Sequence, residues 1–137
     1  MVRDEQIYNS IKKELDDHLN VFNNNIGEDL KNIRNHTYVS RVLLTDVYKS
    51  LVNSGKFLTL VTQLQNEISN LYSRINRRND ILNHLHRHED AFFMNKPIIY
   101  ESDRVTWEYK IEKYAAELSR LESEIKNLMQ KIYRIID

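Results

Sequence analysis

Cysteine is absent from the 137 residues, and the chain contains only two glycines and one proline. Without cysteine there can be no disulfide scaffold, no thiolate nucleophile and no cysteine-based zinc site. β-Sandwiches and α/β folds need many tight turns, which depend on glycine with positive φ or on proline with fixed φ. The sequence therefore predicts an all-α fold built from long helices.

An excess of either charge is also absent, because 20 basic residues balance 20 acidic residues. The chain therefore lacks the overall basic field with which many proteins hold nucleic acids, and we do not expect nucleic acid as its partner. No stretch approaches the ~18 consecutive apolar residues of a membrane-spanning helix, and the charged beginning MVRDEQIYNS does not resemble a secretory signal. We expect an intracellular protein, either cytoplasmic or nuclear.

The C-terminal half contains a regular repeat of apolar residues, spaced alternately by four and three positions. This is the pattern of a coiled-coil seam, in which one stripe of a helix packs against another helix. Its members are Trp107, Ile111, Tyr114, Leu118, Leu121, Ile125, Leu128, Ile132 and Ile135. The repeat predicts a long helix at the end of the chain.

A second seam precedes the first, and the only proline, Pro97, lies between them. The apolar members of this second seam are Phe57, Val61, Leu64, Ile68, Leu71, Ile75, Leu82, Leu85 and Phe92, and its polar members are Arg78 and Glu89. Proline interrupts helices, so we expect a long antiparallel coiled-coil-like helical hairpin over 55–137, with arms of roughly 50 Å. Folding back near residue 97 would pair Arg78 with Glu117, Arg74 with Glu122 and His88 with Trp107.

The N-terminal residues 1–54 are expected to add helices to this hairpin and to complete one irregular helical bundle. Apolar residues at helical spacing predict a helix over about 4–34, with a break near Asn25 as the alternative. A shorter helix is expected over about 37–53, and Gly55 suits the left-handed residue that often follows a helix. This short helix is apolar on several faces, which indicates a helix sandwiched between layers.

The polar stretch from Arg74 to His88 offers a candidate metal site. Asp80, His84 and His88 recur every four residues, and two histidines at that spacing on a helix can share one metal ion. No HExxH motif surrounds them, so a solvated or salt-bridged helix face is the favoured interpretation. We expect no metal and no other cofactor, and keep a helical metal-binding protein as an alternative.

Within the same stretch, Arg78, Asn79 and His84 form the pattern Arg-Asn-x4-His. It resembles the Arg-x(4–6)-His motif of the HEPN helical ribonucleases, and the resemblance covers seven residues. It implies a helical bundle in which Arg78 and His84 flank the scissile phosphate of an RNA. A HEPN-like ribonuclease or nucleic-acid binder is therefore a second alternative, although the seam position of Arg78 favours burial against Glu117.

The expected tip of the hairpin, AFFMNKPIIY, is unusually apolar for a solvent-exposed turn. Aromatic residues and methionine are enriched at the centres of protein interfaces. The partner-binding residues that we predict here are Phe92, Phe93, Met94, Ile98, Ile99 and Tyr100. Packing of the tip against the N-terminal helices of the same chain is the alternative.

The predicted function is that of a non-catalytic interaction or scaffold subunit, which assembles with itself or with partner proteins. No nucleophile–base pair and no glycine-rich phosphate loop is present, so no catalytic residue is expected. Two helices that bury one stripe each gain barely enough free energy to offset the entropy of ordering their residues. Further helices of this chain, or of another chain in an oligomer or complex, must therefore cover the seam.

Overall fold

The structure, a computed structural model, describes residues 4–25, 42–89 and 101–137 of the chain. Within these ranges it contains four α-helices and one 3-10 turn, and no strand. The elements are α1 (Glu5–Asn25), α3 (Asp46–Asn53), η1 (Lys56–Thr59), α4 (Thr62–Glu89) and α5 (Glu101–Ile136). The predicted all-α class and helical bundle are confirmed.

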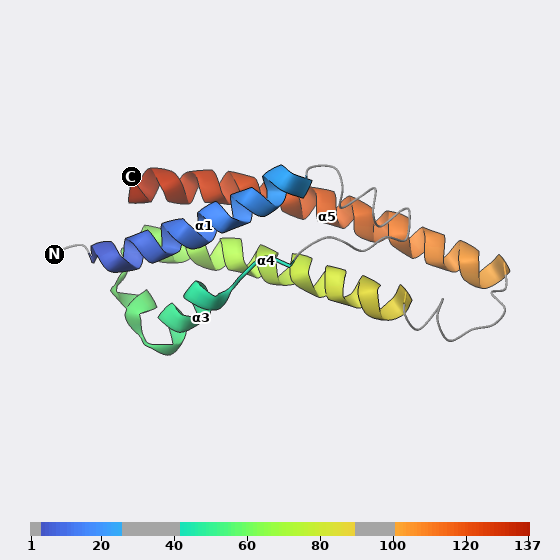
Figure 1. Cartoon of the computed structure of the whole chain (residues 1–137), viewed down its shortest axis with the longest axis horizontal. Helices are drawn as coiled ribbons and strands as arrows, with labels where there is room; N and C mark the ends of the chain where they lie inside the picture. The colour runs from blue at the N-terminus through green and yellow to red at the C-terminus, as the bar shows by residue number, and fades with distance from the viewer. Residues whose placement is uncertain (1–3, 26–41, 90–100) are drawn as a thin grey trace.

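Helices α4 and α5 lie side by side, run in opposite directions and make the most extensive helix–helix contact of the described chain (Figure 1). Along each helix, apolar residues of the predicted seam form one buried stripe. The buried members of the two stripes are Leu64, Ile68, Leu71, Ile75, Leu82 and Leu85 on α4, and Ile111, Leu118, Leu121, Ile125, Leu128 and Ile132 on α5. Val61 departs from the prediction, because it precedes α4 and is exposed.

Two ion pairs show how α4 and α5 are aligned, and they correct the predicted pairing. Glu117 accepts from Arg77, with Nε–Oε1 and Nη2–Oε2 distances of 2.7 and 3.1 Å, and Arg74 Nε lies 2.9 Å from Glu124 Oε2. The predicted pairs of Arg78 with Glu117 and of Arg74 with Glu122 are therefore wrong. Arg77 lies on the exposed flank of α4, from which a long side chain reaches across to α5, whereas Arg78 points into the core.

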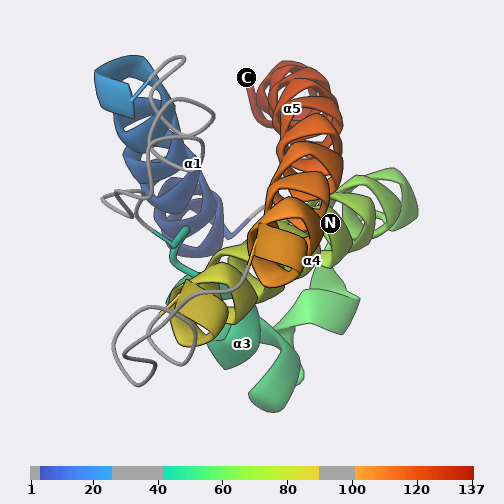
Figure 2. The same ribbon diagram turned by 90° about the vertical axis from the view of Figure 1, so that its right-hand side faces the viewer.

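Helix α1 packs against the C-terminal half of α5 and runs opposite to it. Lys12 Nζ lies 3.1 Å from Asp137 Oδ1, and the Tyr133 hydroxyl donates to Asp16 Oδ1 over 2.5 Å. Figure 2, a view along the long axis, shows α1, α4 and α5 around a common centre, with α3 beside this group. The third helix explains why Met129, which is outside the predicted seam, is buried.

The segment that leads into α3 differs from the predicted helix over 37–53. Residues 42–45 are not helical, and α3 begins at Asp46 and ends at Asn53. Gly55 follows with φ of 78°, as expected for a residue that terminates a helix. The expected sandwich is wrong, because Leu43 and Leu51 are buried but Val52 is exposed.

Several predictions fall outside the described residues. They include the helix over 26–34, the break after Asn25 and the apolar tip formed by Phe92, Phe93, Met94, Ile98, Ile99 and Tyr100. The predicted pairing of His88 with Trp107 also concerns side chains that are not described. In the described ranges, every helix is too short or too polar to cross a membrane.

Candidate functional site

The densest buried polar group joins α1 to α4, and we call Glu14, His18 and Tyr72 the polar cluster. All three side chains are buried although they are polar. One carboxylate oxygen of Glu14 accepts from the backbone N–H of Val47 at 3.1 Å, and the other accepts from the Tyr72 hydroxyl. The carboxylate therefore ties the start of α3 to α1 and α4.

His18 holds the non-helical segment before α3. Its Nε2 lies 2.8 Å from the carbonyl oxygen of Leu44, and a carbonyl can only accept, so Nε2 carries the hydrogen. The buried Nδ1 has no hydrogen-bond partner among the residues that the structure describes. Burial lowers the pKa of His18 below 6.5, and the nearby Arg78 lowers it further, whereas the Leu44 carbonyl, Glu14 and Asp17 act in the opposite direction. The ring is therefore neutral at pH 7.

Tyr72 completes the polar cluster and is flanked by two other rings. Burial raises the pKa of the Tyr72 hydroxyl, and the adjacent Glu14 carboxylate raises it further, so the hydroxyl keeps its proton and donates. The Tyr72 ring stacks on Tyr48 at 4.4 Å between centroids and meets His18 edge-on at 6.0 Å. Because the three polar side chains are buried and bind main chain or one another, we assign the cluster a structural role.

The two residues of the HEPN-like pair differ in exposure and in their neighbours. Arg78 is only 1% exposed, and its guanidinium carbon lies 5.4 Å from the centre of the Phe22 ring. His84 is exposed and packs edge-on against Tyr114, with 5.5 Å between ring centroids. The hollow of about 300 Å³ beside His84 is lined by Arg77, which Glu117 already engages, rather than by Arg78.

The other alternative function, metal binding, depends on Asp80, His84 and His88. In the part of the chain that the structure describes, no group of three or more His, Asp or Glu side chains lies close enough to hold a metal ion. Asp80 and His84 both border the hollow beside Tyr114, and the side chain of His88 is outside the description. The described residues thus provide at most two of the proposed ligands.

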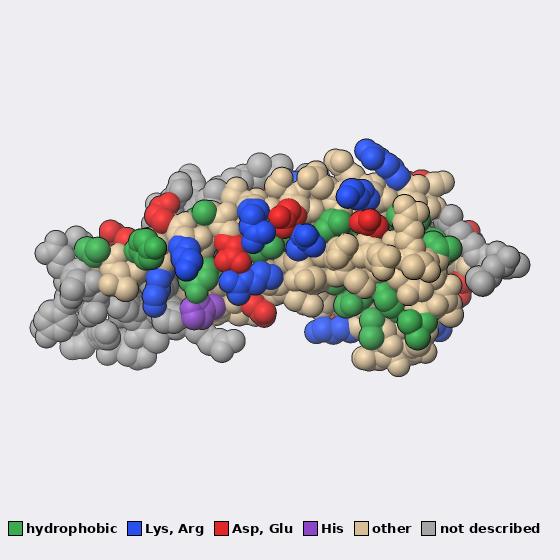
Figure 3. Space-filling view, turned by 180° about the vertical axis from the view of Figure 1, so that it is seen from behind, with side chains coloured by type: hydrophobic (Ala, Val, Ile, Leu, Met, Phe, Trp, Pro, Cys, Tyr) green, Lys and Arg blue, Asp and Glu red, His purple; other side chains and the backbone are tan. Residues whose placement is uncertain are grey.

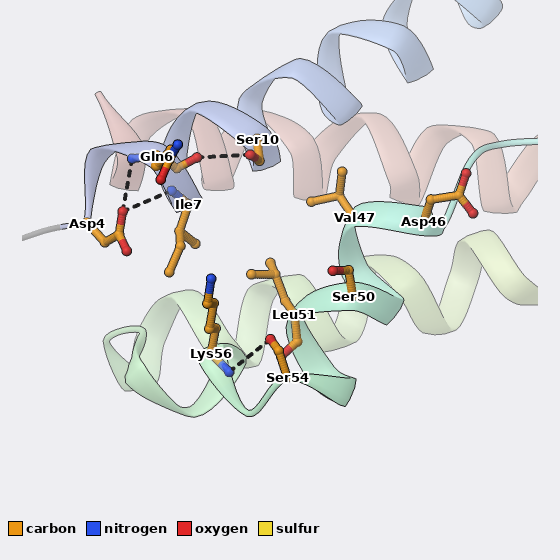
Figure 4. Close-up of a pocket in the computed structure, with 10 residues that line it drawn as sticks. All are labelled: Asp4, Gln6, Ile7, Ser10, Asp46, Val47, Ser50, Leu51, Ser54 and Lys56. Carbon is orange, nitrogen blue, oxygen red and sulfur yellow. Dashed lines mark hydrogen bonds between the residues drawn. The ribbon is translucent and has the colours of Figure 1, made fainter.

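A larger cavity, of about 410 Å³, opens between the start of α1 and the α3–η1 region (Figure 4). Its apolar part is formed by Ile7, Val47 and Leu51. At its edge, Asp4 Oδ1 accepts from the backbone N–H groups of Gln6 and Ile7 at 3.0 and 3.3 Å, so this carboxylate already caps α1. Two of its serine hydroxyls are engaged within the chain, because Ser10 donates to the Gln6 carbonyl and Ser54 donates to the Leu51 carbonyl.

Exposed apolar side chains gather where α3, η1 and α4 meet, and we call Val52, Leu58 and Val61 the η1 corner. Leu58 is 76% exposed, and the other two side chains are each about half exposed. Figure 3 shows hydrophobic side chains grouped at this end of the molecule. This surface could not be predicted from the apolar repeat, which places Val61 in the seam and leaves Leu58 outside it.

Comparisons with known proteins identify no relative of this chain. A scan against models of protein families finds no match, and searches of curated proteins and of solved structures find no similar chain. The HEPN resemblance therefore depends only on the seven residues that carry it.

Proposed function

We propose that the chain is a non-catalytic helical scaffold that associates with a second copy of itself through the η1 corner. In this proposal, α4 and α5 form the coiled-coil-like hairpin that serves as its rigid framework. The observation that carries the proposal is the exposure of Leu58, Val52 and Val61 in and around η1. Contiguous apolar side chains on the surface of a folded domain are typical of protein–protein contacts.

A second copy suits this surface because its three apolar side chains carry no charge. A two-fold axis brings the same patch of two copies together, so the patch must be complementary to itself. Apolar side chains satisfy that condition, whereas a patch of one charge would repel its own copy. Stable interfaces bury about 800 Å² on each partner, more than three side chains can supply. We therefore expect an association that depends on protein concentration.

The proposal is tested by light scattering after size-exclusion chromatography, over a series of protein concentrations. The wild-type mass should rise toward that of a dimer as concentration increases, and Leu58→Asp should remain a monomer. Val105→Asp is the matched control, because Val105 is also an exposed apolar residue but lies on α5. A wild-type monomer at every concentration, or equal effects of the two substitutions, would contradict the proposal.

A further inference from the structure

A groove of about 600 Å³ runs along α4, beside the segment that leads into α3. Three asparagines of α4 line one wall, namely Asn76, Asn79 and Asn83. Their spacings of three and four residues place them on one face of the helix. Residues 42–46 form the opposite wall.

The middle asparagine already binds a main chain. Asn79 Oδ1 accepts from the N–H of Leu43 at 2.8 Å, and Asn79 Nδ2 donates to the carbonyl oxygen of Leu43 at 2.8 Å. One side-chain amide thus satisfies both main-chain groups of one residue, as a neighbouring strand would. Such binding depends on the main chain of the bound residue and tolerates different side chains.

The two outer asparagines have the same side-chain chemistry and are available. Asn76 and Asn83 are exposed, and neither side-chain amide forms a hydrogen bond within the described ranges, although their main-chain groups belong to the helix. Their Cα atoms are seven residues apart on α4, which corresponds to about 10.5 Å along a helix. An extended chain covers that length in about three residues. The groove can therefore accept the main chain of a short extended segment.

Charges and apolar side chains around the groove indicate what that segment should carry. Asp46 and Asp80 both line the groove, and Lys49 is the only cation among the described residues that line it. Neither aspartate forms a salt bridge within the described residues. The net negative charge favours a basic side chain. Val42 and Leu44 are about half exposed at the rim, so they can pack against apolar neighbours of that side chain.

We propose that this groove binds an extended segment of a partner protein that contains lysine or arginine between apolar residues. The amides of Asn76 and Asn83 bind its main chain, and Asp80 faces its basic side chain. This site is separate from the η1 corner and does not require self-association. Leu58→Asp should therefore bind such a segment as well as the wild type does.

The experiment uses full-length ¹⁵N-labelled protein and three pools of capped pentapeptides. The first pool carries a central lysine flanked by mixed Val, Ile and Leu residues, the second carries a central glutamate, and the third is the lysine pool with N-methylated main-chain amides. The first pool should shift the side-chain NH₂ signals of Asn76 and Asn83 saturably. The glutamate and N-methylated pools should bind at least tenfold more weakly.

Substitutions then locate the binding site. Asn76→Ala with Asn83→Ala should weaken binding of the lysine pool at least tenfold, whereas Asn66→Ala, on an exposed part of the same helix, should leave it unchanged. Asn79 is kept, because it holds Leu43. The proposal is overturned if millimolar lysine pool shifts neither amide signal, or if the wild type and the two variants bind it equally. It is also overturned if the same signals respond only to single-stranded RNA or to the protein's own concentration.

Discussion

Replacing Tyr72 with phenylalanine tests whether the polar cluster stabilises the fold. The substitution removes the hydroxyl that donates to Glu14 and leaves the aromatic ring, which stacks on Tyr48. Glu14 is buried, so water cannot readily replace the lost donor. After the substitution, the backbone N–H of Val47 is the remaining donor to this carboxylate among the described residues.

The expected loss follows from the burial of the carboxylate. A hydrogen bond to a charged group contributes roughly 1.5–3 kcal/mol, and a buried polar atom that loses its partner lies at the upper part of that range. We therefore expect Tyr72→Phe to lower the free energy of unfolding by about 2–3 kcal/mol. For a chain of this size, that corresponds to a fall in Tm of about 6–10 °C.

Urea unfolding followed by circular dichroism measures this change. Tyr109→Phe is the matched control, because Tyr109 is 71% exposed and removal of its hydroxyl should change stability by less than about 0.5 kcal/mol. A double-mutant cycle with Glu14→Gln should give a coupling energy above about 1 kcal/mol. If Tyr72→Phe costs less than about 0.5 kcal/mol, or if the cycle shows no coupling, the polar cluster does not stabilise the fold as we argue.

Two further predictions concern pH and backbone conformation. Because burial lowers the pKa of His18 below 6.5, the unfolded chain binds a proton more readily than the folded chain, and stability should fall as the pH drops below about 6.5. Urea unfolding at pH 7.5 and 5.5 should show a smaller loss for His18→Gln than for the wild type, and equal losses would contradict this role of His18. Gly55→Ala should cost about 1–2 kcal/mol in urea unfolding, because Gly55 has φ of 78° and an added Cβ meets no atom within 4 Å, so that only backbone strain acts. Gly55→Asn should cost less, since asparagine tolerates this conformation, and equal costs for the two substitutions would refute the strain argument.

The long helices and most of their buried faces could be predicted from the sequence. Helical periodicity is a local property, so the apolar repeat places Ile68, Ile75, Ile125 and Ile132 on faces that must be covered, whatever covers them. The end of α3 was equally local, because Gly55 alone marks it. These features needed no knowledge of which segments meet.

Only the tertiary structure showed which residues of α4 and α5 pair with one another. Arg77 and Arg78 are adjacent, yet successive residues of a helix are about 100° apart around its axis, so one meets Glu117 and the other is buried beside Phe22. The sequence contained both arginines but not the rotation and alignment of α4 against α5. The predicted partner of Glu117 was therefore wrong by one residue, and that of Arg74 by two.

The polar cluster and the groove depend on long-range contacts in the same way. Glu14 and Tyr72 are 58 residues apart, and nothing near either one indicates the other, although a carboxylate on the apolar face of a helix is a signal that a partner must exist. Apolar spacing alone predicted a helix at 42–45, but the amide of Asn79 and the ring of His18 bind its main chain in a non-helical form. Local spacing thus determined the helices of this protein, whereas contacts between distant residues determined how they meet and which groups remain exposed.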